Sequence, residues 1–224
     1  MIEILLDTAS LSSIEAMIGV YPIAGITCNP TVIRAEGKID FYPHFRRIRE
    51  MIGSGTLHIQ VLAKDTRGII DDAHRLLEGV DDQIYIKIPT TEPGLRAMRQ
   101  LKSEGVHVTA TAIYSKTQGM LALATGVDYV AAYFNRMEAL DIDATANIAS
   151  LIQIAKRGKF ATTVMAASFK NVAQVCAAAE IGASVTVPPN LLRAALCTPD
   201  VIQAVESFAD DWKATFGTET LPAL

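Results

Sequence analysis

The stretch IYIKIPTTEPGLRAMRQLKSEGVHVTATA, residues 84–112, contains the pattern that decides the fold. An apolar run of strand length, Ile84–Ile88, is followed by Pro93–Ser103, whose apolar residues lie three or four apart, as is typical of an amphipathic helix. Gly105 follows the helix, where a left-handed residue lets the chain turn back, and a second strand-length run, Val106–Ala112, comes next. Parallel strands need a crossover of helix length, so the stretch predicts a β-α-β unit with parallel strands.

The same unit recurs along the whole chain. The predicted strands are Glu3–Leu6, Ile23–Thr27, Leu57–Leu62, Ile84–Ile88, Val106–Ala112, Tyr129–Ala132, Thr162–Ala166 and Ser184–Val187. The predicted helices are Ser10–Ile18, Pro43–Met51, Thr66–Leu77, Pro93–Ser103, Ser115–Ala124, Thr145–Arg157, Asn171–Ala179 and Asn190–Leu196. Eight such pairs are the number that closes into a (β/α)8 TIM barrel, which we predict for residues 1–198. A doubly wound open sheet is the alternative, but no strand-to-helix turn carries a glycine motif for nucleotide phosphates.

A ninth amphipathic segment, Pro199–Phe216, remains outside the eight units. Its apolar residues fall on one face of a helix: Val201, Ile202, Val205, Phe208 and Trp212. We therefore predict an extra C-terminal helix and tail over residues 199–224. Two interpretations of its apolar face are open, because it either caps the bottom of the barrel or packs on a neighbouring subunit.

Composition limits the class of protein. The chain has 224 residues, of which 50% are hydrophobic and 20% charged, and its formal net charge is −4. These values predict one soluble, ordered domain and exclude a disordered or collagen-like chain. Twenty Lys and Arg against twenty-four Asp and Glu leave no basic excess for a phosphate backbone, so we predict no nucleic-acid partner.

The sequence also predicts a cytoplasmic protein. Every apolar stretch is interrupted well short of the roughly 18 residues that span a membrane, so no membrane segment is expected. The N-terminus has no basic region and carries Glu3 and Asp7 where a signal peptide is apolar. The three cysteines, Cys28, Cys176 and Cys197, lie far apart and predict neither a disulfide framework nor a zinc site.

Polar side chains lie at or just after the C-terminal ends of almost all the predicted strands. They are Asp7, Thr27, Asn29, Gln60, Lys87, Thr109, Thr111, Tyr133, Arg136, Ser168 and Lys170. A barrel of this type has its active site at that end. Because a sheet covered on both faces is otherwise almost continuously apolar, these groups predict a ligand there.

Lys87 is the most informative of them, since it is the only charged residue in the strand Ile84–Ile88. Desolvation in a barrel interior disfavours the ammonium form and leaves more neutral amine, the form that attacks a carbonyl carbon. The alternative is a structural ion pair, with Asp7 as the counter-ion rather than a base.

Two cations and a hydroxyl, Arg136, Lys170 and Ser168, follow the sixth and seventh strands, close to where such barrels often bind phosphate. They predict a phosphorylated substrate, and solvated loop charges are the alternative. The four histidines, His44, His58, His74 and His107, are scattered without metal-ligand spacing and are interpreted as structural, so no metal and no cofactor are expected.

Seven ordered motifs resemble the transaldolase family, and within it the fructose-6-phosphate aldolase type. They are Leu5-Leu6-Asp7-Thr8, residues 24–31 (AGITCNPT), Ile59-Gln60-Val61, Ile86-Lys87-Ile88-Pro89, residues 109–114 (TATAIY), Tyr133-Phe134-Asn135-Arg136 and residues 166–170 (AASFK). The resemblance spans the whole chain. It implies a class I aldolase with Lys87 as the Schiff-base lysine, and a ring of ten subunits in which the C-terminal helix reaches a neighbour.

The resemblance also implies roles for the other residues. Asp7 takes the proton from the hydroxyl beside the bond that breaks, Thr27 and Asn29 hold donor hydroxyls, and Thr111 positions a water. Thr109 lies in the same motif and is predicted to bind substrate. Arg136, Ser168 and Lys170 bind phosphate, Lys170 standing where many transaldolases carry arginine.

Two positions separate the subtypes. Transaldolases resemble one another in having Glu where this chain has Gln60 and Phe where it has Tyr133. Gln60 cannot titrate, whereas a tyrosine phenol can transfer a proton, which favours release of free dihydroxyacetone over transfer to an acceptor. The hypothesis is an aldolase that cleaves fructose 6-phosphate to dihydroxyacetone and glyceraldehyde 3-phosphate. The alternatives are a transaldolase and a non-catalytic sugar-phosphate-binding barrel.

Overall fold

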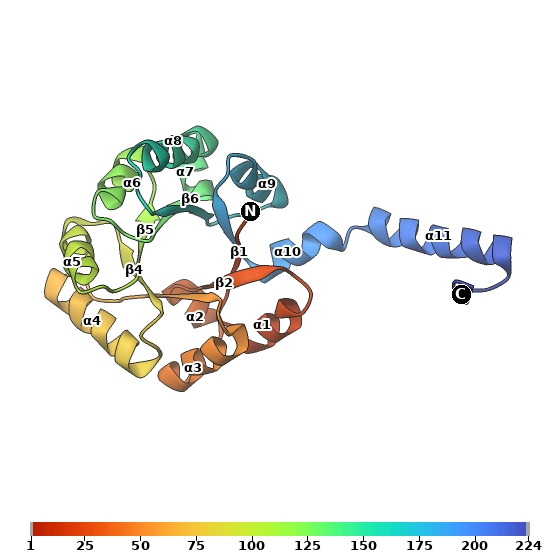
Figure 1. The fold of residues 1–224 in the computed structure, drawn as a ribbon, viewed down its shortest axis with the longest axis horizontal. Coiled ribbons are helices and arrows are strands. Elements are labelled where there is room, and N and C mark those ends of the chain that lie inside the picture. Colours follow the sequence, from red (N-terminus) through yellow and green to blue (C-terminus); the bar gives the residue numbers. More distant parts are fainter. Residues whose placement is uncertain (1, 223–224) are drawn as a thin grey trace.

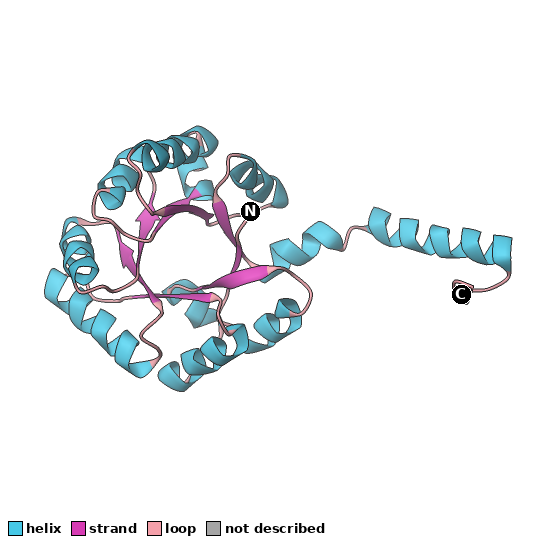
Figure 2. Cartoon of the chain, in the orientation of Figure 1, coloured by secondary structure: helices cyan, strands magenta, loops and turns pink. Residues whose placement is uncertain are grey.

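A computed structural model describes residues 2–222 and contains a closed barrel of eight parallel strands (Figure 2). Each strand pairs with its neighbours in chain order, and β8 pairs with β1 to close the ring. The strands are β1 Ile4–Asp7, β2 Ile23–Thr27, β3 Thr56–Gln60, β4 Tyr85–Pro89, β5 Val108–Ile113, β6 Tyr129–Tyr133, β7 Thr163–Ala167 and β8 Ser184–Val187. The predicted (β/α)8 barrel is confirmed, and the open sheet is wrong.

The helices lie around this ring, except for the C-terminal one (Figure 1). They are α1 Leu11–Ile18, α2 Pro30–Ala35, α3 Phe41–Ile52, α4 Thr66–Gly79, α5 Glu92–Ser103, α6 Lys116–Leu123, α7 Phe134–Glu138, α8 Ala144–Arg157, α9 Val172–Glu180, α10 Pro189–Leu196 and α11 Pro199–Phe216. Every predicted strand and helix is present, with its ends within two residues of the expected ones. Gly105 has a φ of +82°, which supports its expected role in turning the chain from α5 toward β5.

Two hydrophobic cores hold the barrel. The larger one lies between the sheet and the helices and takes its side chains from almost every element. The smaller one fills the lower interior of the barrel with Leu5, Tyr129, Ala131 and Met165, against which Tyr85 packs. Below it, Glu3 accepts hydrogen bonds from the hydroxyls of Tyr129 and Ser184, at 2.8 and 2.6 Å. The apolar filling therefore occupies only the lower interior, and the upper interior is left to polar side chains.

The sequence pattern missed two short helices, α2 and α7, which both follow a strand at the upper end of the barrel. They span six and five residues, fewer than two helical turns, so no apolar periodicity develops. Asn29 caps α2, since its Oδ1 accepts hydrogen bonds from the backbone N–H groups of Thr31 and Val32, and Pro30 occupies the first helical position.

The C-terminal helix α11 extends away from the barrel (Figure 1). It has the predicted bounds, and none of its residues is buried. Its apolar residues Val201, Ile202, Val205 and Phe208 are each at least half exposed. The interpretation of α11 as a cap on the barrel bottom is therefore wrong, because the helix makes no apolar cover for that end. No helix within residues 2–222 is both long and apolar enough to cross a bilayer.

Candidate active site

A cavity of about 500 Å³ opens at the C-terminal ends of the strands, and we call it the active-site cavity. Eight of the eleven predicted site residues line it: Asp7, Asn29, Gln60, Lys87, Tyr133, Arg136, Ser168 and Lys170. They come from six strands or the segments that follow them. The parallel barrel therefore brings together side chains separated by more than 160 positions in the sequence.

Lys87 lies at the inner end of this cavity, on β4, and its side chain is 4% exposed. The flanking Ile86 and Ile88 belong to the outer core, so strand alternation directs the lysine inward. Its Nζ donates a hydrogen bond to the carbonyl oxygen of Cys28 at 2.9 Å. Within residues 2–222, no ion pair of 4.0 Å or less joins Lys87 to Asp7 or to any other carboxylate. The hydrogen-bond partner of the amine is thus a neutral backbone carbonyl, and the charge of Lys87 acts on Asp7 without a direct ion pair.

The thiol of Cys28, next to Lys87, is not suited to act as a nucleophile. Its side chain is fully buried, and burial raises the pKa of the Cys28 thiol to about 12, despite the nearby positive charge of Lys87. A thiol with that pKa stays protonated at neutral pH and is a poor nucleophile. Cys28 contributes its backbone carbonyl instead.

Asp7 ends β1 and contributes the carboxylate of the cavity. Its Oδ1 accepts a hydrogen bond from the Thr27 hydroxyl at 3.0 Å. Burial raises the pKa of the Asp7 carboxyl above its ordinary value of 3.8, while the positive charge of Lys87 and the hydrogen bond from Thr27 lower it. A carboxylate whose pKa is raised is a stronger base than one in water.

Tyr133 and Gln60 lie on opposite sides of the lysine strand, on β6 and β3. The phenol oxygen of Tyr133 is 3.2 Å from the hydroxyl oxygen of Thr111, and its ring meets that of Tyr114 edge to face, with ring centroids 5.4 Å apart. Ala112, between Thr111 and the end of β5, has a φ of +56°, and the β5–β6 register shifts there. This irregularity turns the strand end toward the phenol.

The outer end of the cavity carries the two exposed cations, Arg136 on α7 and Lys170 after β7. Ser168 lies beside them with a φ of +64°. Gln174, which is 8% exposed, joins the two segments: its Oε1 accepts a hydrogen bond from the backbone N–H of Lys170 at 2.7 Å, and its Nε2 donates to Asn135 at 3.2 Å and also to Glu138. These bonds join the two segments that carry the cations.

A polar layer lies beneath the lysine. His58 is fully buried, and its Nδ1 and Nε2 are hydrogen-bonded to the hydroxyls of Thr109 at 2.8 Å and Thr56 at 3.0 Å. Its ring stacks on Tyr85 with centroids 4.6 Å apart. Burial, and then the charge of Lys87, lowers the pKa of His58 well below 6.5, so the imidazole is neutral. Its interpretation as a structural histidine is confirmed.

Three predicted site residues do not line the active-site cavity. Thr27, Thr109 and Thr111 are fully buried, and each hydroxyl has a protein partner: Asp7, His58 and Tyr133 respectively. Direct contact with a substrate is thus not supported for these threonines, because other side chains cover them. The arrangement favours an indirect role through the residue that each one binds.

Asn29 lines the cavity and also caps α2. The Oδ1 atom accepts from the backbone of α2, at 2.9 and 3.1 Å. Its Nδ2 amide has no protein acceptor within residues 2–222 and is free to donate to a ligand in the cavity. The sequence reasoning missed Thr186 on β8, which also lines the cavity, because β8 carries no charged residue and its threonine suits a strand.

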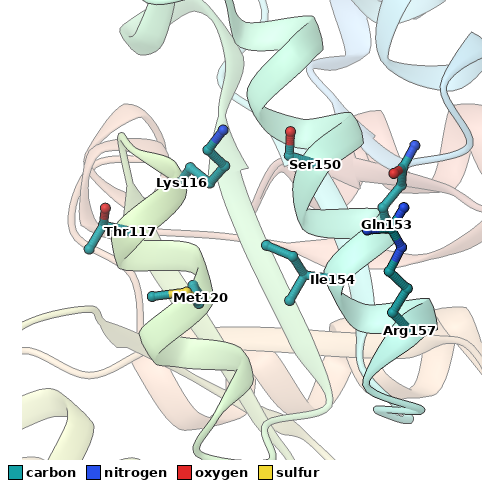
Figure 3. Close-up of a pocket in the computed structure, with 7 residues that line it drawn as sticks. All are labelled: Lys116, Thr117, Met120, Ser150, Gln153, Ile154 and Arg157. Carbon is teal, nitrogen blue, oxygen red and sulfur yellow. The ribbon is translucent and has the colours of Figure 1, made fainter.

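Two further hollows lie outside this cavity. One, of about 390 Å³, is on the outer surface between α6 and α8 and is lined by Lys116, Thr117, Met120, Ser150, Gln153, Ile154 and Arg157 (Figure 3). The other, of about 480 Å³, adjoins the active-site cavity and shares Pro30 and Gln60 with it. Neither contains a nucleophile with a base. Residues 2–222 contain no group of three His, Cys, Asp or Glu side chains arranged to hold a metal ion.

Residues 4–219 match the family model described as Transaldolase/Fructose-6-phosphate aldolase. The chain belongs to this family. A curated relative from Streptococcus pneumoniae, named "Probable fructose-6-phosphate aldolase", is 44% identical over 212 residues, which cover 94% of this chain and 96% of the relative. The transaldolase/fructose-6-phosphate aldolase assignment agrees with the motifs and with the barrel that carries them.

A solved structure shares the fold at much lower identity. The crystal structure of 2,3-dimethylmalate lyase, a PEP mutase/isocitrate lyase superfamily member, aligns with a TM-score of 0.53 and 13% identity, covering 99% of this chain and 85% of that one. At this identity the likeness supports the barrel architecture alone.

Proposed function

We propose that the protein is a Schiff-base aldolase that reversibly cleaves fructose 6-phosphate to dihydroxyacetone and glyceraldehyde 3-phosphate, with Lys87 as the nucleophile. The observation that carries the proposal is the buried Lys87 amine, bonded to a backbone carbonyl rather than to a carboxylate, in one cavity with Asp7. Membership of the transaldolase/fructose-6-phosphate aldolase family supports it, as does the name of the pneumococcal relative.

The first step joins enzyme and substrate. The neutral Lys87 amine attacks the C2 ketone, and loss of water leaves an iminium that withdraws electrons from C3. Asp7 then takes the proton from the C4 hydroxyl, the C3–C4 bond breaks, and its electron pair passes to the iminium as an enamine. Glyceraldehyde 3-phosphate leaves with the C4 carbonyl. The raised pKa of Asp7 suits a base in this step.

The second step regenerates the free enzyme. The enamine carbon takes a proton from the Tyr133 phenol or from a water that Gln60 orients, and hydrolysis of the iminium releases dihydroxyacetone. Tyr133 is aimed by its hydrogen bond with Thr111 at 3.2 Å. Since Gln60 carries no titratable proton, this assignment gives the proton transfer to the tyrosine.

The substrate phosphate lies at the outer end of the cavity. Arg136 and Lys170 supply positive charge there, and Ser168 supplies a hydroxyl. Both cations are exposed, so binding phosphate does not require the desolvation that a buried pair of cations would. The reaction needs no metal and no cofactor in this proposal.

The test is release of glyceraldehyde 3-phosphate from fructose 6-phosphate, with and without erythrose 4-phosphate, with Lys87→Met as the control. Release without the acceptor is expected. Release only with the acceptor would make the protein a transaldolase, the second candidate, to which the family description gives equal place.

A covalent test separates both enzymes from a non-catalytic sugar-phosphate-binding barrel. Borohydride reduction in the presence of dihydroxyacetone is expected to leave an adduct on Lys87, identified by peptide mass spectrometry. A folded protein that forms no adduct would exclude both catalytic functions.

We also propose, from the sequence, a cytoplasmic homo-oligomer in which α11 packs on a neighbouring subunit in a ring of ten. The exposed apolar face of α11 supports this, since Val205 and Phe208 are 62% and 70% exposed in the single chain. Sedimentation of the intact protein is expected to give a stable oligomer, and Phe208→Glu is expected to weaken it. A stable monomer would contradict the proposal.

A further inference from the structure

Thr186 lies in the wall of the active-site cavity and has no role in the steps above. It is on β8, the strand that closes the barrel against β1, and its side chain is 1% exposed. Its Oγ1 is 2.7 Å from the Oγ1 of Thr27, a residue 159 positions away in the sequence. Thr27 in turn is 3.0 Å from Asp7 Oδ1. The three groups form a continuous chain across β8, β2 and β1.

The direction of these hydrogen bonds follows from counting hydrogens. An ionised carboxylate can only accept, so the single hydroxyl hydrogen of Thr27 goes to Asp7. The Thr27 oxygen is then the acceptor at the 2.7 Å contact, and Thr186 is the donor. The chain runs from the Thr186 hydroxyl to the Thr27 hydroxyl to the Asp7 carboxylate.

From this geometry we propose that Thr186 is a positioning residue for the proton transfer at Asp7, acting through the hydroxyl of Thr27. Thr27 has a rotatable hydroxyl in a fully buried site. The hydrogen bond from Thr186 fixes the orientation in which the Thr27 hydrogen points at Asp7. It also polarises that hydroxyl, because hydrogen bonds in series strengthen one another.

Thr186 influences Asp7 through Thr27 because the hydrogen bond from Thr27 helps to stabilise the ionised form of Asp7. The charged group that acts on it is Lys87 from β4, and the Cys28 thiol faces it from the end of β2. Tyr133 from β6 lines the same cavity, as do the more distant cations Arg136 and Lys170. Burial disfavours the carboxylate, whereas the charge of Lys87 and the hydrogen bond from Thr27 favour it. Weakening this hydrogen bond therefore raises the pKa of Asp7.

This inference rests on the proposed function, in which Asp7 is the base, and it is tested by a double-mutant cycle in the intact protein. Thr186→Val removes the donor at nearly constant volume, Thr186→Ser keeps a hydroxyl, and each is combined with Thr27→Val. The measurement is kcat and KM for fructose 6-phosphate cleavage between pH 5 and pH 9. Near-ultraviolet circular dichroism checks the fold, and Thr186→Ala replaces the valine variant if the latter does not fold.

Thr186→Val is expected to move the acid-side midpoint of the kcat profile upward by about 0.5 to 1 pH unit and to lower kcat below that midpoint by about threefold to tenfold, with KM unchanged. Thr186→Ser should restore most of this loss. In the Thr27→Val background, the further change to valine at 186 should alter kcat by less than about twofold, because the residue through which it acts is gone.

Three results would overturn the inference: an equal loss in both backgrounds, a higher KM with an unmoved pH profile, or a serine variant as impaired as the valine variant. The second would mean that Thr186 contacts substrate directly. Failure of the proposed function is a different result, since wild-type protein would then release no glyceraldehyde 3-phosphate and form no borohydride adduct at Lys87.

Discussion

The buried imidazole beneath the lysine makes the stability of the barrel depend on pH in a way that can be calculated. His58 is fully buried, both of its ring nitrogens are hydrogen-bonded, and its pKa lies well below 6.5. In the unfolded chain the same imidazole titrates near 6.5. Between these two values the unfolded chain binds more protons than the folded one, so stability rises with pH.

The sign and size follow directly. The contribution of neutral His58 is complete above the unfolded pKa of 6.5 and is lost as the pH falls below it. Each pH unit below 6.5 lowers the free energy of unfolding by about 1.4 kcal/mol while the folded imidazole stays neutral. Between pH 7 and pH 5 the loss from this one residue is therefore at most ~1.9 kcal/mol, reached when the folded imidazole stays neutral over the whole range.

The assay compares wild type with His58→Phe by urea unfolding at pH 5, 6, 7 and 8, at one protomer concentration. From pH 7 to pH 5, wild type is expected to lose more unfolding free energy than the variant, by up to ~1.9 kcal/mol. Asp7, whose raised pKa acts with the opposite sign, is present in both proteins and cancels.

Thr109→Val is the matched control, because it removes one hydrogen bond of His58 and leaves the buried imidazole in place. Its stability is expected to be lower than that of wild type at every pH, with the same dependence on pH. If the difference between wild type and His58→Phe is constant from pH 8 to pH 5, the histidine is not neutral in the folded protein and the reasoning is refuted.

Three further predictions follow from the cavity and its supports. Asp7→Asn is expected to lower kcat by about 10² to 10⁴ while the borohydride adduct at Lys87 still forms, because base catalysis is lost and the nucleophile is kept; loss of the adduct would contradict this. Gln174→Leu is expected to raise KM for glyceraldehyde 3-phosphate in the synthetic direction by about threefold to tenfold, and KM for glyceraldehyde much less, because the segments that carry the two cations are no longer joined. Gly25→Ala is expected to lower the free energy of unfolding by about 3 kcal/mol, measured in urea, since its Cβ would lie 2.3 Å from the carbonyl oxygen of Thr56.

The barrel was predictable from sequence because its elements leave separate signals. Buried parallel strands appear as short apolar runs, and their covering helices show a period of three to four residues. The helices that the sequence did not predict, α2 and α7, are too short to show any period. Both follow a strand at the active-site end of the barrel, and α7 also contributes Phe134 and Met137 to the core.

The candidate site was predictable only in part, because strand position does not show how deeply a side chain is buried. Strand position showed that Lys87, Asp7 and Gln60 lie at one end of the barrel, and all three line the cavity. Position alone did not show that Thr109 and Thr111 lie behind other side chains. That distinction depends on which long side chains cover which short ones, and the partners are 51 and 22 residues apart in the sequence.

The cations at the two ends of the cavity differ in solvent exposure. This difference follows from the position of each one relative to the end of its strand. Lys87 lies within β4, 4% exposed, where neighbouring strands shield it and a carbonyl oxygen orients it. Arg136 and Lys170 come after β6 and β7 have ended, where no strand covers them and both are exposed. An amine that must attack a ketone gains from low solvation, whereas cations that bind a phosphate must stay charged. Exchanging these placements would weaken both functions, so the position of each cation, within a strand or in the segment that follows one, sets its chemistry.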